Sequence, residues 1–398
     1  MRLLIPSTGT PVSLLDLLRA CLPVGGEREF EEAFCRWVGS PWCRFVNSGT
    51  AALYLILKAL RALRPDRDEV LLPAYTAPSL ILPIRRAGLR PVLCDVDLET
   101  FNADLEDAEA RLTARTLALL AIPMFGLPCD AAKAGRMAGR HGAFLVEDAA
   151  SAMGSRMDGR MAGTWGDAGF ISLNRGKNLS TVSGGVILTD REEVQRAVTE
   201  EWGAFPAPSR LAEVRLRGKA FALALAVRPF WYTLLHGAIA RFKYTTLHAD
   251  FEALRYTDFQ ARLGVSLLRR AETFLTQRYK NGILLYDLLA QTEGIALPRL
   301  LPRVHAVFNQ FPVLLPDQET RDAAHRAALS AGVEATTLYP EPIHRLYGDL
   351  VSGLDPDPFP KATAMSRRLL LLPTHPLAGE DRLREAAEAI KKVLSNEC

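Results

Sequence analysis

Residues 117–148 read LALLAIPMFGLPCDAAKAGRMAGRHGAFLVED, and the order of apolar and polar residues in this stretch decides the fold. Leu117–Ile122 and Ala143–Val146 are near-continuous apolar runs, which are typical of strands covered on both faces. Between them, Ala131–His141 has the composition and spacing of a helix. A strand, a helix and a second strand in this order indicate a layered α/β architecture with a parallel sheet.

The same alternation extends in both directions along the chain. We expect further strands at Cys43–Val46, Glu69–Leu72, Pro91–Val96 and Val186–Leu188, and further helices at Glu27–Val38, Ala51–Leu63, Pro78–Ala87, Leu105–Arg111 and Glu192–Trp202. Later segments, which suit a smaller α+β domain, are a helical stretch Phe259–Leu289, a strand within Phe308–Leu315, and helices Gln318–Ala331 and Asp381–Leu394. Because 398 residues exceed what one compact core usually holds, we predict a large domain at 1–249 and a small one at 250–398.

Composition excludes several classes of function. The 48 basic and 45 acidic side chains leave a net charge of +3, which is too small and too dispersed for a nucleic-acid-binding surface. Six scattered cysteines without a CxxC pair fit a reducing cytoplasm, and the seven histidines show no metal-ligand spacing. The first ten residues lack the apolar run of a signal peptide. Small molecules are therefore the expected partners, and we predict no metal and no nucleic acid.

One segment, residues 215–245, is unusually apolar. Its uninterrupted run Ala220–Val227 is shorter than the roughly 18 to 20 residues that a membrane-spanning helix needs. Phe230, Trp231 and Tyr232 lie inside its apolar part, Phe221–Phe242, which is flanked by Arg215, Arg217, Lys219, Arg241 and Lys243. Two interpretations stay open: a helical pair buried against the core or a second subunit, and a helix lying on the inner face of a membrane.

Two short motifs follow strands of the predicted sheet. Ser48-Gly49-Thr50 forms a turn of small residues between a strand and a helix, where free backbone N–H groups can hold a phosphate, although many such turns hold nothing. Asp148 ends an apolar strand at the carboxyl edge of the sheet, where α/β proteins place their sites, although an acid there is also a common helix cap.

The third motif contains a lysine in an unusual setting. Lys177 follows the apolar strand that contains Ser172, lies in a loop of small polar residues with Asn174, and precedes the paired glycines Gly184-Gly185. An isolated lysine is usually solvated, but Lys177 occurs together with the other groups that one cofactor requires. Pyridoxal phosphate needs an amine for its Schiff base, a carboxylate for its ring nitrogen and donors for its phosphate, and Lys177, Asp148 and the Gly49-Thr50 turn with Ser172 supply them. Partial burial would lower the pKa of the Lys177 amine and make it nucleophilic.

These motifs, in this order, resemble the DegT/DnrJ/EryC1/StrS family of nucleotide-sugar aminotransferases. The likeness covers almost the whole chain. It rests on 47–53 (NSGTAAL), 147–150 (EDAA), the 172–177 loop, and the C-terminal segments 339–344 and 371–376. The resemblance implies the type I fold of pyridoxal-phosphate-dependent aminotransferases and a homodimer whose active site is shared between subunits.

The resemblance also implies a reaction and residue roles. An amino donor, usually glutamate, would load the cofactor, and a keto group of a nucleotide-activated sugar or related polyol would accept the amine. Lys177 would carry the cofactor, and Asp148 would pair with the pyridine nitrogen. The phosphate would be held by Gly49, Thr50 and Ser172, and Ser48, Ser151 and Asn174 would be further cofactor-binding residues.

Five positions depart from the family pattern near the cofactor. Ala77 stands where an aromatic ring normally stacks on the pyridine, so Tyr75 is the candidate for that role. The other four departures are Ser151 for glutamine, Asn174 for histidine, Ser183 for glutamate and Ala253 for an asparagine of the partner subunit. We interpret the chain as a divergent branch with a different acceptor. The alternatives are a dehydratase or lyase that uses the same cofactor, and a catalytically silent, membrane-associated homologue.

Overall fold

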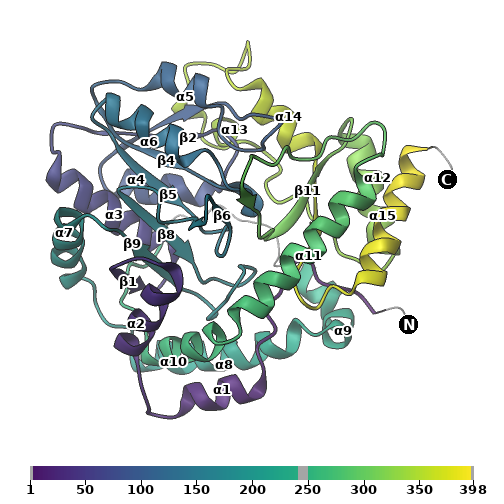
Figure 1. Ribbon diagram of the computed structural model, residues 1–398, viewed down its shortest axis with the longest axis horizontal. Coiled ribbons are helices and arrows are strands. Elements are labelled where there is room, and N and C mark those ends of the chain that lie inside the picture. Colours follow the sequence, from purple (N-terminus) through teal and green to yellow (C-terminus); the bar gives the residue numbers. More distant parts are fainter. Residues whose placement is uncertain (1–2, 241–249, 396–398) are drawn as a thin grey trace.

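A computed structural model describes residues 3–240 and 250–395 of the chain, and a seven-stranded sheet lies at its centre (Figure 1). The strand order is β1-β9-β8-β5-β4-β2-β3. The strands are β1 Cys43–Val46, β2 Glu69–Pro73, β3 Arg90–Cys94, β4 Thr116–Ala121, β5 Phe144–Asp148, β8 Ala168–Ser172 and β9 Gly185–Leu188. The predicted α/β fold with a mostly parallel sheet is confirmed, because β3, β2, β4, β5 and β8 pair in parallel and only β9 and β1 run antiparallel to their neighbours.

Apolar residues on both faces of the strands explain how the sheet is covered. Along β2, Leu71 belongs to one hydrophobic cluster while Val70 and Leu72 belong to another, because successive side chains point to opposite faces. The helices α5 Leu105–Arg111 and α6 Ala131–Arg140 pack on the Leu71 face, and α3 Gly49–Leu63 packs on the other. Two more helices, α4 Ile81–Arg86 and α7 Glu192–Gly203, pack against α3.

The C-terminal part forms a smaller unit around a second sheet. Strands β11 Gln310–Leu314 and β12 Leu369–Pro373 pair antiparallel, and α12 Gln318–Ser330 packs beside α15 Glu380–Leu394. The predicted strand and both helices are thus present. Three short strands, β6 Arg156–Met157, β7 Arg160–Met161 and β10 Val304–His305, form a separate small sheet.

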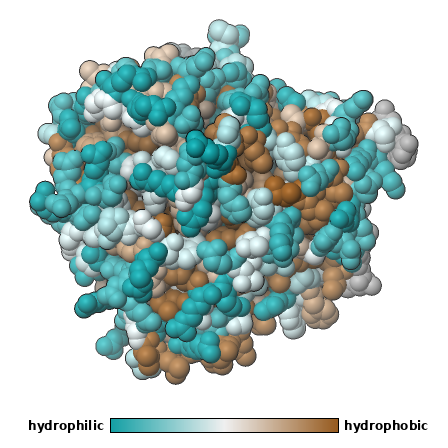
Figure 2. All heavy atoms as spheres, in the orientation of Figure 1, coloured by the Kyte–Doolittle hydropathy of each residue, from teal (hydrophilic) through white to brown (hydrophobic). Residues whose placement is uncertain are grey.

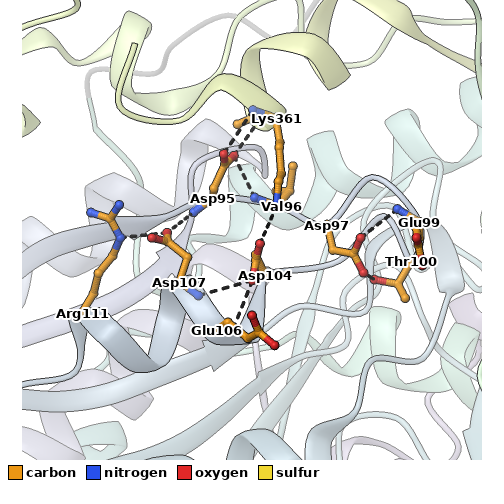
Figure 3. A network of polar contacts seen from close by, with 11 residues as sticks. Asp95, Val96, Asp97, Glu99, Thr100, Asp104, Glu106, Asp107, Arg111 and Lys361 are labelled. Carbon is orange, nitrogen blue, oxygen red and sulfur yellow. Dashed lines mark hydrogen bonds and ion pairs between the residues drawn. The ribbon is translucent and has the colours of Figure 1, made fainter. Parts of the chain in front are cut away.

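A polar network attaches this smaller unit to the edge of the central sheet (Figure 3). The buried Asp95 carboxylate, just after β3, accepts hydrogen bonds from the backbone amides of Lys361 (3.1 Å) and Ala362 (2.8 Å). These amides open helix α14 Pro360–Arg368, where the helix dipole favours a negative charge. Asp104 accepts a 2.6 Å hydrogen bond from the Lys361 ammonium. The carboxylates of one unit therefore cap and anchor a helix of the other.

The predicted helix Phe259–Leu289 is two helices. Helix α10 Asp258–Leu268 ends at Arg269, and α11 Ala271–Leu289 begins after Arg270, whose side chain forms an ion pair with Asp16. Helix α10 packs against α1 Leu14–Cys21 and α2 Glu27–Val38 of the N-terminal region, whereas α11 packs against α15. The division of the chain at residue 249 stays a prediction.

The apolar segment forms a helical pair, α8 Arg210–Ala226 and α9 Pro229–Ala240, and its predicted remainder, 241–245, lies outside the described residues. Ala220 is the single buried residue of α8, and Leu216, Phe221, Leu223 and Ala224 of this helix pack partly buried against a core cluster, so both interpretations of the segment stay open. Among the described residues, none of the helices has both the length and the apolar character required to cross a bilayer. The same part of the chain contains no group of three or more metal-ligating side chains.

Candidate active site

The strand ends bring the predicted site residues to one edge of the sheet. Strands β5 and β8 are parallel neighbours, and Asp148 lies opposite Phe170 in their register, so the carboxyl ends of both strands meet. Asp148 ends β5 and Ser172 ends β8. Because side chains alternate along β5, Glu147 points to the opposite face, where its carboxylate accepts a hydrogen bond from the Trp165 amide.

The Lys177 amine points at the turn that follows Asp148. Its Nζ donates a hydrogen bond of 2.9 Å to Oγ of Ser151, and no carboxylate forms a salt bridge with it within the described residues. Burial lowers the pKa of Lys177, although the nearby Asp148 carboxylate opposes this shift. Compared with a solvated lysine, a larger share of this amine is therefore neutral at neutral pH, as nucleophilic chemistry requires.

Asp148 is buried beside this lysine. Burial raises the pKa of its carboxyl to about 6, while the Ala150 amide, 3.0 Å from Oδ1, and the charge of Lys177 act in the opposite direction. Desolvation raises the pKa of the partly buried Tyr339 phenol, and the Asp148 carboxylate adds to this shift. The Asp148 carboxylate therefore influences the protonation of an amine and of a phenol that come from two distant parts of the chain.

The small-residue turn lies against the end of β8. A Cβ on Gly49 would be only 3.3 Å from Cβ of Ser172, so a larger residue would crowd the Ser172 hydroxyl. Ser48 caps helix α3 through a 3.1 Å hydrogen bond from the Ala51 amide to its Oγ. Within residues 3–240 and 250–395, the amides of Gly49 and Thr50 have no hydrogen-bond acceptor. Two free amides and one hydroxyl therefore lie together at a helix N-terminus, as in many phosphate sites.

The remaining predicted site residues are placed differently. Asn174 is exposed, and its Oδ1 accepts the Arg175 amide within the loop. Tyr75 is only 1% exposed, and its hydroxyl donates to the carbonyl of Tyr339 at 3.3 Å. The Tyr75 and Tyr339 rings meet edge to face at 5.8 Å. Of these two rings, Tyr339 is the one whose pKa responds to Asp148.

Two further residues belong to this site but were not assigned to it from the sequence. Tyr339 stands in a recognised C-terminal segment, yet its approach to Asp148 depends on how the smaller unit docks. Arg278, in the middle of α11, is fully buried and holds the loop from behind: it donates to the carbonyls of Gly9 and Asn309, each at 3.0 Å, and to the carbonyl of Lys177 at 3.5 Å. A cation in an amphipathic helix usually indicates a solvated face, so the sequence carried no signal for this role.

The layered sheet with a smaller C-terminal unit is the fold of pyridoxal-phosphate-dependent aminotransferases, and the chain is an aminotransferase of that class. A model of the DegT/DnrJ/EryC1/StrS aminotransferase family matches residues 25–391. The chain belongs to this family, as its sequence motifs predicted.

Two relatives show how the family varies. The chain is 30% identical to a dTDP-4-dehydro-2,3,6-trideoxy-D-glucose 4-aminotransferase of Saccharopolyspora spinosa, over 93% of this chain and 89% of the relative. It is also 33% identical to a dTDP-4-dehydro-2,6-dideoxy-D-glucose 3-dehydratase of the same organism, over 70% of this chain and 60% of that relative.

Solved structures agree with the fold. S. venezuelae DesV superposes with a TM-score of 0.74 at 26% identity, covering 95% of this chain and 93% of that one. The PLP form of a putative sugar aminotransferase from Streptococcus pneumoniae gives a TM-score of 0.77 at 20% identity, covering 99% of this chain and the whole of that one.

Proposed function

We propose that this aminotransferase uses pyridoxal 5'-phosphate to move an amino group from glutamate to a keto group of a nucleotide-activated sugar or related polyol. The observation that carries the proposal is the 2.9 Å hydrogen bond from the Lys177 amine to Ser151, next to the buried carboxylate of Asp148. Related aminotransferases that act on nucleotide sugars support the choice of substrate class.

The groups at this edge of the sheet fit the cofactor. Lys177 would hold it covalently, Asp148 would bind its ring nitrogen, and the amides of Gly49 and Thr50 with the Ser172 hydroxyl would bind its phosphate. Gly49 supports this fit, because a side chain there would fill the space beside Ser172. When bound, the cofactor supplies an electron sink for the bond broken at the substrate carbon.

Lys177 has a second role in the proposed reaction. Once its amine is free, Nζ takes a proton from the donor carbon and later returns a proton to the acceptor, as a general base and acid. Its lowered pKa brings the amine closer to the working pH than an ordinary lysine would be. The Ser151 hydroxyl would orient Nζ between these steps, because it already accepts a hydrogen bond from it.

The departures from the family pattern bear on the acceptor rather than on the cofactor. Tyr75, Ser151 and Asn174 stay predicted cofactor contacts. Asp148 contributes to raising the pKa of Tyr339, so we expect the smaller unit to supply one aromatic ring to the site beside Tyr75. We further propose a cytoplasmic homodimer whose partner subunit completes the site.

A dehydratase is the second candidate, because one relative with that activity is 33% identical. Sugar dehydratases resembling this family carry histidine where this chain has Lys177. Retention of the lysine, with its amine directed at Ser151, favours transamination.

A two-stage experiment tests the proposal. The purified chain, loaded with pyridoxal phosphate, is mixed with single amino donors, and release of the matching keto acid is measured; the aminated enzyme is then offered a panel of nucleotide ketosugars. We expect keto-acid release to be fastest with glutamate, and loss of the amino group only to sugars carrying a keto group. Release of water and a dehydrated sugar, with no keto acid, would establish the dehydratase instead.

A further inference from the structure

Large hydrophobic side chains that remain exposed gather in one region of this protein. Twelve of the fourteen such residues in the described part of the chain lie on α1 or just after it, or on α8 and α9; Leu3 and Leu354 are the exceptions. The twelve, which we call the apolar face, are Leu14, Leu15, Leu18, Leu22, Val24, Leu211, Val214, Leu225, Phe230, Trp231, Leu234 and Leu235. Solitary exposed leucines are ordinary, but a concentration of this size marks an interaction surface.

The exposed apolar residues of α1 and of α9 are spaced so that they line one side of their helix as a stripe. Leu14, Leu18 and Leu22 follow one another at four-residue intervals, as do Phe230 and Leu234. Helix α8 contacts both α1 and α9, so the stripes adjoin. In Figure 2, hydrophobic atoms line the lower edge of the molecule, where Figure 1 places α1 and α8.

The inner side of α9 is attached to the protein by polar contacts. The amide of Leu4 donates to Oγ1 of Thr233 at 2.8 Å, and the Tyr232 hydroxyl donates to Oε2 of Glu334 at 2.7 Å. Trp231, next to Tyr232, is 43% exposed. The helical pair α8–α9 is therefore attached to the rest of the protein on one side, and its large apolar side chains are exposed on the other.

Charge distinguishes between the surfaces that could cover this face. Residues 207–240 contain five lysines and arginines against a single acid, Glu213, which forms an ion pair with Arg217. Arg210 and Arg215 are exposed and have no ion-pair partner among the described residues. Against a second copy of the chain, a two-fold contact would set this cationic strip against itself. An anionic surface neutralises it.

We propose that the apolar face docks the enzyme on the surface of an anionic lipid bilayer. Leucine, phenylalanine and tryptophan would enter the boundary between headgroups and acyl chains, and Arg210 and Arg215 would contact the headgroups. The helices lie along the surface, because none of the described ones is long and apolar enough to cross it. This inference does not depend on the proposed reaction.

Vesicle binding by the full-length enzyme tests the proposal. The protein is sedimented with vesicles of phosphatidylcholine alone and of phosphatidylcholine mixed with phosphatidylglycerol. We expect at least tenfold stronger partitioning to the mixed vesicles, weakened by salt, and a blue shift of tryptophan emission that disappears in Trp231→Phe. Equal or absent binding to the two kinds of vesicle overturns the proposal.

Matched variants locate the surface. Leu14→Ser/Leu18→Ser should reduce partitioning more than tenfold, and Arg210→Gln/Arg215→Gln about fivefold per charge. The controls, Leu354→Ser and Arg367→Gln/Lys392→Gln, alter residues that are also exposed but lie elsewhere, and these variants should bind as the unaltered chain does. Equal loss in controls and test variants contradicts the proposal. So does a shift of the test variants from dimer to monomer without vesicles in analytical ultracentrifugation, because a second copy would then occupy the face.

Discussion

The Lys177 loop and the helical pair α8–α9 are held in the protein by different means. The loop is fixed from behind by Arg278, from the N-terminal segment by Thr10, whose hydroxyl donates to the Lys177 carbonyl at 3.1 Å, and from in front by Ser151. These partners lie between 26 and 167 residues away in the sequence. The helical pair, by contrast, contributes one buried alanine and a few partly buried apolar side chains from α8, and the buried Tyr232 with a few polar contacts from α9.

This difference indicates where the chain tolerates change. Three segments far apart in the sequence hold the Lys177 loop in position. Because a change in any one of them would displace the loop, substitutions around Lys177 should have large effects on function. A pair of helices with an exposed outer side can vary while the body remains folded. On our proposals, departures from the family pattern would have different meanings in the two regions: a different acceptor at the loop, and a membrane-docking surface at α8–α9.

The largest effect is expected from Lys177→Ala. Loss of the amine removes both the covalent attachment and the proton carrier, so transamination should fall by on the order of 10³-fold or more. Wild-type protein should show an absorbance band near the visible edge that the variant lacks. Ser183→Ala, a nearby change whose hydroxyl contacts Gln260 instead of the lysine, is the control and should retain the band. Retention of both band and activity in the alanine variant would remove Lys177 from the mechanism.

Asp148→Asn should have the next largest effect. Transamination should fall by roughly 10² to 10³-fold, because a neutral amide cannot stabilise a protonated ring nitrogen. Since the pKa of Asp148 is about 6, the carboxylate predominates above pH 6, and cofactor affinity should fall as pH decreases through this value. Titration of cofactor binding from pH 5 to 8 measures this, and the asparagine variant should show a flat profile. An unchanged slope in the variant would assign the titration to another group.

The same change should have the opposite effect on folding of the cofactor-free protein. The folded-state pKa of Asp148 is raised above its ordinary value of 3.8, so its contribution to stability is lost as pH increases from about 4 to 6 and remains lost above that. Asp148→Asn should therefore raise the unfolding temperature at pH 8. Opposite signs for stability and cofactor binding would identify a functional rather than a structural carboxylate.

The sequence was sufficient to predict much of the fold, and the structure places Lys177, which the sequence predicted as a site residue, close to Ser151 and Asp148. Strands such as Leu117–Ile122 could be predicted from the sequence because burial on both faces requires uninterrupted apolar runs. Lys177 was predicted as a site residue because its loop resembles that of the family. The break between α10 and α11 was missed because residues on both sides of Arg269 have helical periodicity. Tyr339 and Arg278 were missed because their positions depend on packing between segments far apart in the chain, which no local pattern records.

Arg278→Met tests whether this buried arginine holds the Lys177 loop in place. Burial lowers the pKa of this guanidinium to about 9, and its removal leaves the Gly9 carbonyl without its donor, whereas the Asn309 carbonyl keeps the Thr374 hydroxyl. The free energy of unfolding in urea should decrease by about 2 kcal/mol, since a buried unsatisfied group costs roughly 1 to 3 kcal/mol. Arg367→Met, at an exposed position, should change it by less than about 0.5 kcal/mol. Equal effects of the two variants would show that Arg278 does not hold the loop.

The smallest effect is expected at the attachment of α9. Tyr232→Phe removes the hydroxyl that donates to Glu334, so the free energy of unfolding should decrease by about 1 kcal/mol while transamination remains within about twofold. Tyr279→Phe is the matched control, because that ring stacks on His305 and its hydroxyl has no partner within the described residues. If Tyr232→Phe lowered activity as much as Asp148→Asn, the two regions would be coupled, and the helical pair would belong to the catalytic unit rather than to a separate surface.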